Sequence, residues 1–142
     1  MSALPDLPII DVRLVSHPRF IQFVRVLAGE GAALAGFGEE DRGRIELAVV
    51  EGFTNIIRHG YRGKTDEPIE IRVEVPPGAF RMELSDRAPF VDPSKIASRP
   101  LDEVRPGGLG VHLMRSTMDR VDYLKNARGG TTLVLEKRVQ AT

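Results

Sequence analysis

Two strongly alternating segments, which flank Pro76-Pro77-Gly78, constrain the fold of this chain most. Residues 69–75 place isoleucine or valine at every second position with charged residues between them, and residues 80–84 repeat the alternation with Phe, Met and Leu. Period-two alternation is typical of a β-strand with one buried face, and a Pro-Pro-Gly sequence between two such strands indicates a turn. The sequence therefore predicts a β-hairpin here.

Three further segments have the pattern of strands. Residues 9–15 alternate apolar and charged positions and predict the first strand. Near the C-terminus, residues 121–125 and 131–137 predict two closing strands, which the turn-forming residues 126–130 join. Together with the hairpin, these segments predict five strands.

Helices are predicted in three places. Ser16 is the candidate cap of the first helix, and Pro18 fits its first turn. The apolar positions of this helix recur at spacings of three and four: Phe20, Phe23, Val24, Leu27, Gly31 and Leu34. A second helix is predicted from about Glu39 to His59, with Gly60 as the residue that ends it. Its main buried stripe comprises Ile45, Ala48, Val49, Phe53 and Ile56. A third, short helix opens at residues 107–110.

The order of these elements indicates the fold class. Helices that cover one face of a mixed, mostly antiparallel sheet make an α/β (α+β) two-layer sandwich. The length of 142 residues suits one domain, residues 1–142. Residues of about 87–107 are polar, contain four prolines and have no sustained period. Such a stretch between periodic segments predicts a lid or binding loop.

The composition excludes several classes of function. Lys plus Arg and Asp plus Glu both number 20, so the chain has no basic field with which to bind nucleic acid. The absence of cysteine excludes disulfides, thiolate zinc sites and cysteine nucleophiles. No segment approaches the roughly 20 apolar residues of a membrane span, so we expect a cytoplasmic protein without a membrane partner. The histidines at 17, 59 and 112 are not clustered with carboxylates, and we expect no histidine metal site.

Four polar residues are candidates for a functional site because of their positions in the predicted strands and helix. Asp86 continues the inward-facing parity of the second hairpin strand, so its carboxylate is predicted to point inward, where a buried charge needs a partner. Thr131 shares the parity of the apolar positions in the last strand, so its hydroxyl is predicted to point inward too. Glu51 and Asn55 are four residues apart and lie on one face of the second helix.

Each of these features also has an ordinary structural explanation. Glu51 and Asn55 could belong to a solvated helix face, Asp86 could cap a turn, and Thr131 could be an ordinary strand residue. The glycine run at residues 107–110 could be a flexible loop. Glycines that open a helix, however, expose N–H groups at its positive end, which is a ready anion site. The order and spacing of the whole set favour a functional site.

This ordered set resembles the GHKL ATPase superfamily, which includes gyrase and the histidine-kinase catalytic domain. Residues 46–61, ELAVVEGFTNIIRHGY, resemble the N-box helix of the anti-sigma-factor serine/threonine protein kinases. Residues 107–123, GGLGVHLMRSTMDRVDY, resemble their second glycine box with its helix and following strand. Residues 129–135, GGTTLVL, resemble their closing strand, so that the resemblance covers nearly the full chain and implies the GHKL fold.

The resemblance implies a role for each of the selected residues. Glu51 occupies the catalytic acidic position and would be the general base on the acceptor hydroxyl, while Asn55 would hold the Mg2+ ion that bridges the phosphates of ATP. Asp86 would accept a hydrogen bond from the adenine amino group, with Thr131 supporting it through water. The glycine-box residues assigned to the nucleotide are Gly108, Leu109 and Gly110.

One segment departs from the family pattern. After the adenine-binding aspartate, the family usually has glycines that let the backbone approach the base, whereas Asp86 is followed here by Arg-Ala-Pro-Phe. Ala88 stands where a glycine is common, and the resemblance still assigns it to the nucleotide-binding segment. We interpret this departure as tolerated.

The function implied by the resemblance is that of an ATP-dependent serine/threonine protein kinase of the anti-sigma-factor type. Such a kinase phosphorylates a STAS-type anti-anti-sigma partner in a partner-switching system, and a sigma factor is a second implied partner. A homodimer is compatible with the resemblance. One alternative is a non-catalytic, nucleotide-sensing module that binds a regulatory protein, which Ala88 favours. Another is a detached histidine-kinase catalytic domain, although the chain has no phosphoacceptor helix pair.

Overall fold

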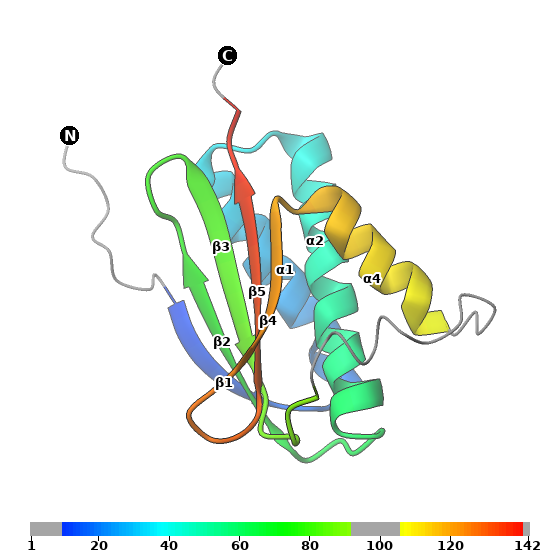
Figure 1. The fold of residues 1–142 in the computed structure, drawn as a ribbon. Coiled ribbons are helices and arrows are strands. Elements are labelled where there is room, and N and C mark those ends of the chain that lie inside the picture. Colours follow the sequence, from blue (N-terminus) through cyan, green and yellow to red (C-terminus); the bar gives the residue numbers. More distant parts are fainter. Residues whose placement is uncertain (1–9, 92–105, 141–142) are drawn as a thin grey trace.

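The computed structural model describes residues 10–91 and 106–140, with the backbone alone for residues 106–111. Its five strands form one sheet in the order β1-β2-β3-β5-β4 (Figure 1). The strands are β1 (Ile10–Val15), β2 (Pro68–Glu74), β3 (Ala79–Ser85), β4 (Arg120–Lys125) and β5 (Thr131–Arg138). Every pairing among these described strands is antiparallel, so the sheet contains none of the parallel pairing that a mixed sheet would have.

The helices lie on one face of the sheet, as Figure 1 shows. The short 3-10 turn η1 (Pro18–Phe20) leads into α1 (Ile21–Ala35), and α2 (Glu39–Asn55) continues into a π-helical turn, η2 (Ile56–Gly60). The last helix, α4 (Pro106–Thr117), packs against α2. This arrangement confirms the predicted two-layer α/β sandwich. Within the described parts of the chain, the helices fall short of the length and apolar character that crossing a bilayer requires.

The core lies between α2 and the sheet, as the helix periodicity predicts. The predicted stripe of α2 is buried, with Ile45, Ala48, Val49 and Phe53 fully enclosed. The hairpin contributes its alternate apolar side chains from the other side; those fully or almost fully buried are Ile69, Ile71, Val73, Phe80, Met82 and Leu84. The Pro76-Pro77-Gly78 turn forms as expected, with Gly78 at φ 72° and the Ala79 N–H donating to the Pro76 carbonyl.

The predicted buried stripe of α1 is wrong at two positions. Phe23 and Leu34 are 48% and 62% exposed, and the face toward the sheet is lined by small residues, with Ala28 and Ala32 fully buried. Gly31 explains the difference, because a Cβ atom there would lie 2.7 Å from the Phe80 ring. The helix approaches the sheet so closely at Gly31 that no larger side chain fits there, and Phe23 and Leu34 are turned outward.

Ser16 does not cap the first helix, contrary to the sequence prediction. Its buried hydroxyl donates to the Lys64 carbonyl at 2.6 Å and accepts from the Glu67 N–H at 3.1 Å, which ties the end of β1 to the segment before β2. The cap of η1 is His17, whose Nδ1 accepts from the Arg19 N–H at 3.0 Å. Because the Ser16 hydroxyl makes its hydrogen bonds to this distant segment, it is not available to cap the helix.

The uncovered face of the sheet carries charged side chains in alternating sign. Arg81 contacts Glu74 at 3.1 Å and Glu136 at 3.3 Å, so the three side chains form a row across β2, β3 and β5. Glu83 lies beside this row. Partial burial, followed by the neighbouring carboxylate of Glu74, raises the pKa of Glu83, and the nearby arginines Arg72 and Arg81 offset only part of that effect.

Gly31→Ala should destabilise the protein. Helix propensity favours alanine by about 1 kcal/mol, but forcing a methyl group into a packed core typically costs about 1–3 kcal/mol. Gly43 in α2 is the matched control, because a Cβ atom there has nothing within 4 Å, and Gly43→Ala should stabilise. Urea denaturation of both variants measures the effects. Equal stabilisation by the two substitutions would contradict the close approach of α1 to the sheet.

Glu83→Gln should make the protein more stable than wild type at pH 7. The pKa of Glu83 is higher in the folded state than in the unfolded state, so ionising this side chain lowers the stability of the fold. This cost is complete at pH values above the raised pKa. This cost fades as the pH falls toward the ordinary glutamate pKa of about 4.3, so the two proteins should converge there. Thermal unfolding between pH 4 and 8 checks this, with the exposed Glu30→Gln as control. A difference that did not depend on pH would rule out this explanation.

Candidate functional site

Asp86 lies directly after β3 with its side chain turned into the protein, as its parity predicts. It is 6% exposed, and one carboxylate oxygen, Oδ1, accepts hydrogen bonds from the backbone N–H groups of Ala88 and Thr131, both at 3.1 Å. The bond to Ala88 caps the turn after β3, as the ordinary structural explanation of Asp86 predicts. The bond to Thr131 adds a contact 45 residues along the chain.

The second carboxylate oxygen of Asp86 faces the end of the second helix. A Cβ atom on Gly60 would lie 3.5 Å from Asp86 Oδ2, in ordinary van der Waals contact, so the end of η2 lies close beside that oxygen. Burial raises the pKa of Asp86, and the two backbone hydrogen bonds lower it only in part. A desolvated carboxylate whose second oxygen makes no hydrogen bond among the described residues suits a ligand that presents a hydrogen-bond donor.

Thr131 contacts Asp86 through its backbone. Its N–H donates to the carboxylate, and its carbonyl accepts from the Asp86 N–H at 2.9 Å. The Thr131 side chain is half-buried at the start of β5. The role of its hydroxyl through water stays a prediction, whereas the backbone contact is a direct one that parity alone did not reveal.

Ala88 is buried beside the same carboxylate. Its methyl group would lie 3.7 Å from a Cβ atom on Gly60, so Ala88 and the end of η2 come together around Asp86. The backbone N–H of Ala88 is already bonded to Asp86, which an alanine can do as well as a glycine. The departure from the family pattern therefore leaves the local hydrogen bonding intact.

The second helix carries the other polar residues toward this carboxylate. Glu51 and Asn55 are half-buried on α2, and Asn55 is its last residue. The helical run ends at Gly60, as predicted, but its last turn widens into the π-helical turn η2, closed by the Tyr61 N–H to the Ile56 carbonyl at 2.8 Å. This turn brings Gly60 against Asp86.

Asn55 offers an oxygen that suits a metal ion. Its Oδ1 atom is buried and has no hydrogen-bond partner within the described parts of the chain. An unpaired buried carbonyl oxygen is costly, so such an atom calls for a ligand or ion. Mg2+ prefers oxygen ligands and commonly takes only one or two from the protein. The residues present therefore fit a Mg2+ ion bound mainly through a substrate.

The glycine box forms the first turns of α4. Gly108, Leu109 and Gly110 have helical backbone within α4, which begins at Pro106. α4 packs along α2, where a Cβ atom on Gly52 would lie 3.5 Å from the Met114 sulfur. The N-terminal end of α4 lies toward the η2 end of α2 in Figure 1. The predicted lid, about residues 87–107, falls mainly on residues 92–105, which lie outside the described residues.

Two side chains that sequence reasoning missed hold the segment after Asp86. The Tyr61 hydroxyl donates to the Pro68 carbonyl at 2.5 Å and accepts from the Arg87 N–H at 2.7 Å. Burial, followed by the Asp86 charge, raises the pKa of Tyr61. Asn126 donates from Nδ2 to the Asp86 carbonyl at 3.0 Å. An asparagine that opens a turn predicts local hydrogen bonds, but no sequence signal links it to a residue 40 positions away.

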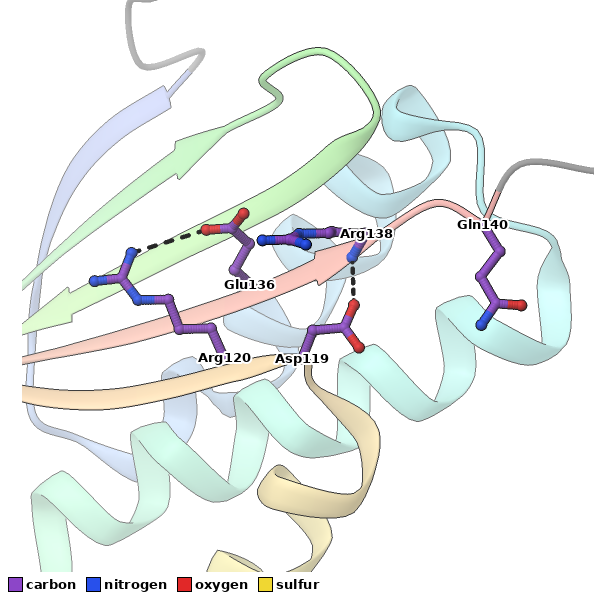
Figure 2. A pocket seen from close by; sticks show the side chains of 5 residues that line it. All are labelled: Asp119, Arg120, Glu136, Arg138 and Gln140. Atoms are coloured by element: carbon purple, nitrogen blue, oxygen red, sulfur yellow. Dashed lines mark hydrogen bonds and ion pairs between the residues drawn. The ribbon is translucent and has the colours of Figure 1, made fainter.

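A cavity of about 460 Å³ lies at the opposite end of β5 from Asp86. Figure 2 shows its lining, in which Arg120 pairs with Glu136 and the Arg138 N–H donates to Asp119. Among the residues that line this cavity, no side-chain atom is both buried and without a hydrogen-bond partner, as Asn55 Oδ1 is. The candidate site is therefore the convergence of β3, β5, η2 and α2.

Comparison with known proteins shows which proteins this chain is similar to. Residues 16–137 match the family model described as the histidine kinase-like ATPase domain. The chain is 26% identical over 139 residues to the serine-protein kinase RsbW of Bacillus pumilus, covering 91% of this chain and 85% of that protein. It is 29% identical over 121 residues to the anti-sigma F factor of Halalkalibacterium halodurans, covering 82% and 83% of the two chains.

Solved structures agree on the fold. The structure of the RsbU and RsbW domains of Rv1364c from Mycobacterium tuberculosis superposes with a TM-score of 0.62 at 19% identity, covering 91% of this chain and 31% of that one. The histidine kinase domain of the E. coli osmosensor EnvZ superposes with a TM-score of 0.50 at 17% identity, covering 97% and 93%. With its sheet, its helix layer and the match over residues 16–137, this chain belongs to the histidine kinase-like ATPase domain family.

Proposed function

We propose that this protein is an ATP-dependent serine/threonine protein kinase of the anti-sigma-factor type. It transfers phosphate to a STAS-type anti-anti-sigma protein and has a sigma factor as its second partner. The observation that carries the proposal is the buried Asp86 carboxylate, whose Oδ2 lies beside Gly60 at the end of the helical run that carries Glu51 and Asn55.

In this proposal, Asp86 recognises the adenine amino group. Oδ1 is committed to the N–H groups of Ala88 and Thr131, which leaves Oδ2 as the acceptor beside Gly60. A hydrogen bond to a charged acceptor in a desolvated position is worth about 1.5–3 kcal/mol. Asp86 therefore favours a base with an exocyclic amine at that position over a base with a carbonyl.

The phosphates would lie between the end of α2 and the start of α4. Asn55 Oδ1, buried without a partner among the described residues, would hold Mg2+, and Gly108, Leu109 and Gly110 would present backbone N–H groups to the phosphate oxygens. When bound, the ion would neutralise charge on the phosphates. Phosphoryl transfer depends mainly on such positioning and charge stabilisation.

Glu51 would act as the general base. It lies four residues before Asn55 on α2, which places the two side chains on the same face of the helix. A carboxylate there can take the proton of the acceptor serine or threonine hydroxyl while Asn55 holds the metal. One relative supports the acceptor class, since it is named a serine-protein kinase, and the other, named an anti-sigma F factor, supports the sigma factor as a partner.

A non-catalytic, nucleotide-sensing partner module is the alternative. This alternative keeps the adenine and phosphate contacts but gives Glu51 no catalytic role. It therefore predicts nucleotide binding without phosphate transfer. Ala88 was the sequence feature that favoured it, and its N–H bonds Asp86 normally in this structure. The kinase is therefore the better-supported proposal.

Asp86→Asn should invert the base preference. The amide oxygen would keep both backbone hydrogen bonds, so the NH2 group would take the place of Oδ2 and face the adenine amine donor to donor. ATP affinity should fall by about tenfold or more, while ITP, with a carbonyl in place of the amine, should bind better than to wild type. Isothermal titration calorimetry with Mg2+ measures both. Unchanged ATP affinity would contradict the assignment.

The same variant should stabilise the protein without nucleotide. The pKa of Asp86 is raised in the folded state, so its charge costs stability at neutral pH, and this cost disappears as the pH falls toward about 3.9. Asp86→Asn should therefore melt above wild type at pH 7, with the difference fading in acid. Lower stability than wild type at pH 7 would show that the charge itself is needed for folding.

Glu51→Gln should abolish transfer and preserve binding. A positioned general base contributes about 10²–10⁴-fold, so transfer of radiolabelled phosphate from ATP to a STAS partner should fall by that factor. ATP affinity should stay within about twofold of wild type, since Glu51 does not contact the base. The control is Glu39→Gln, an exposed glutamate in the first turn of the same helix. Undiminished transfer by Glu51→Gln would remove its role, and binding without transfer in wild type would favour the alternative module.

A further inference from the structure

The peptide unit that follows Asp86 is held from both sides by side chains of distant segments. Its carbonyl, on Asp86, accepts from Asn126 Nδ2 at 3.0 Å, and its N–H, on Arg87, donates to the Tyr61 hydroxyl at 2.7 Å. Because a peptide unit is planar, two bonds at its opposite atoms fix the orientation of the whole plane. Asn126 comes from the β4–β5 turn and Tyr61 from the segment after η2, so two independent elements set this orientation.

The direction of the Asn126 amide is determined by its own turn. Its Oδ1 atom accepts from the backbone N–H groups of Arg128 and Gly130, both at 3.0 Å. The backbone N–H of Asn126 also donates to the Gly130 carbonyl at 2.9 Å. With the oxygen committed to two donors, the NH2 group can only point away from the turn, toward Asp86.

The turn approaches Asp86 more closely than any side chain at Gly130 would allow. A Cβ atom on Gly130 would lie 2.1 Å from the Asp86 carbonyl oxygen and 2.7 Å from its carbonyl carbon. Real Cβ atoms do not come this close to backbone atoms, so the glycine is required by the contact. The Asn126 bond therefore operates within a tight backbone-to-backbone approach.

These contacts determine where the Asp86 carboxylate points. The backbone N–H and carbonyl of Asp86 are both bonded to the β4–β5 hairpin, to the Thr131 carbonyl and to Asn126. Together the two bonds restrict the backbone dihedrals that direct the side chain toward Gly60. Without the Asn126 donor, only the bond from the Arg87 N–H to the Tyr61 hydroxyl still orients this peptide unit, and a desolvated carboxylate gains hydration by turning outward.

We propose that Asn126 is a positioning residue for base recognition, which aims the Asp86 carboxylate at the exocyclic amine of a purine nucleotide. The inference rests on the proposed function, because it takes Asp86 as the acceptor for that amine. Asn126 itself does not touch the nucleotide; it acts through the carbonyl of Asp86. Its substitution should therefore change the discrimination between bases more than the binding of the phosphates.

The test compares ATP with ITP in Asn126→Asp. Aspartate keeps the oxygen that accepts from Arg128 and Gly130 but cannot donate to the Asp86 carbonyl. With Mg2+ present, calorimetry should give ATP affinity weakened by about tenfold and ITP affinity changed by less than about twofold. In the Asp86→Asn background, where the amide favours ITP, the same substitution should weaken ITP binding and move the ATP-to-ITP ratio back toward one. Ala127→Ser, an exposed position in the same turn, is the control.

Two results would overturn the proposal. Equal weakening of ATP and ITP would make Asn126 a purely structural residue, and unchanged ATP affinity would give it no role at the site. If wild type binds the two nucleotides equally, the proposed role of Asp86 fails instead. The positioning role of Asn126 is then tested by a measurement that needs no nucleotide. An NMR titration of the Asp86 carboxyl in Asn126→Ala should give a pKa closer to the ordinary aspartate value, and an unchanged pKa would refute the positioning.

Discussion

The site depends on keeping one charged carboxylate out of water at the end of β3. Asp86 is tolerated there because the N–H groups of Ala88 and Thr131 compensate one of its oxygens. The compensation is partial, since burial still raises its pKa. The Asp86 carboxylate has therefore lost its water, and the protein's hydrogen bonds replace that hydration only in part. Such an acceptor is stabilised most by a ligand that supplies the missing hydrogen-bond donor.

The helix layer supplies the second requirement, which is a helix end that reaches this carboxylate. α2 is anchored in the core by Ile45, Val49 and Phe53, so its opposite face is fixed with it. The widening into η2 lets the chain finish at Gly60 against Asp86. One helix therefore places Asn55, whose oxygen has no partner among the described residues, one turn before Gly60 and Asp86. π-Helical turns are frequent at functional sites.

The sequence predicted the features that follow from periodicity. The hairpin, the buried stripe of α2 and the inward side chain of Asp86 all follow from alternation or helical spacing. It did not predict what depends on distance between elements: the outward-turned Phe23, because α1 approaches the sheet closely at Gly31, or the hydroxyl of Ser16, which bonds a distant segment. The Asn126 contact was hidden for the same reason, since only the folded hairpin brings it to Asp86.

The central claim is that these separated segments form one binding site for a purine nucleoside triphosphate. The most direct measurement is the change in amide NMR shifts of the whole chain on addition of Mg-ATP. The account predicts that the largest shifts cluster on the amides around Asp86, including Gly60, Ala88 and Thr131, with the side-chain amide of Asn55. Residues at the opposite end of β5, around the cavity of Figure 2, should not shift. Shifts confined to that cavity, or none at all, would contradict the account.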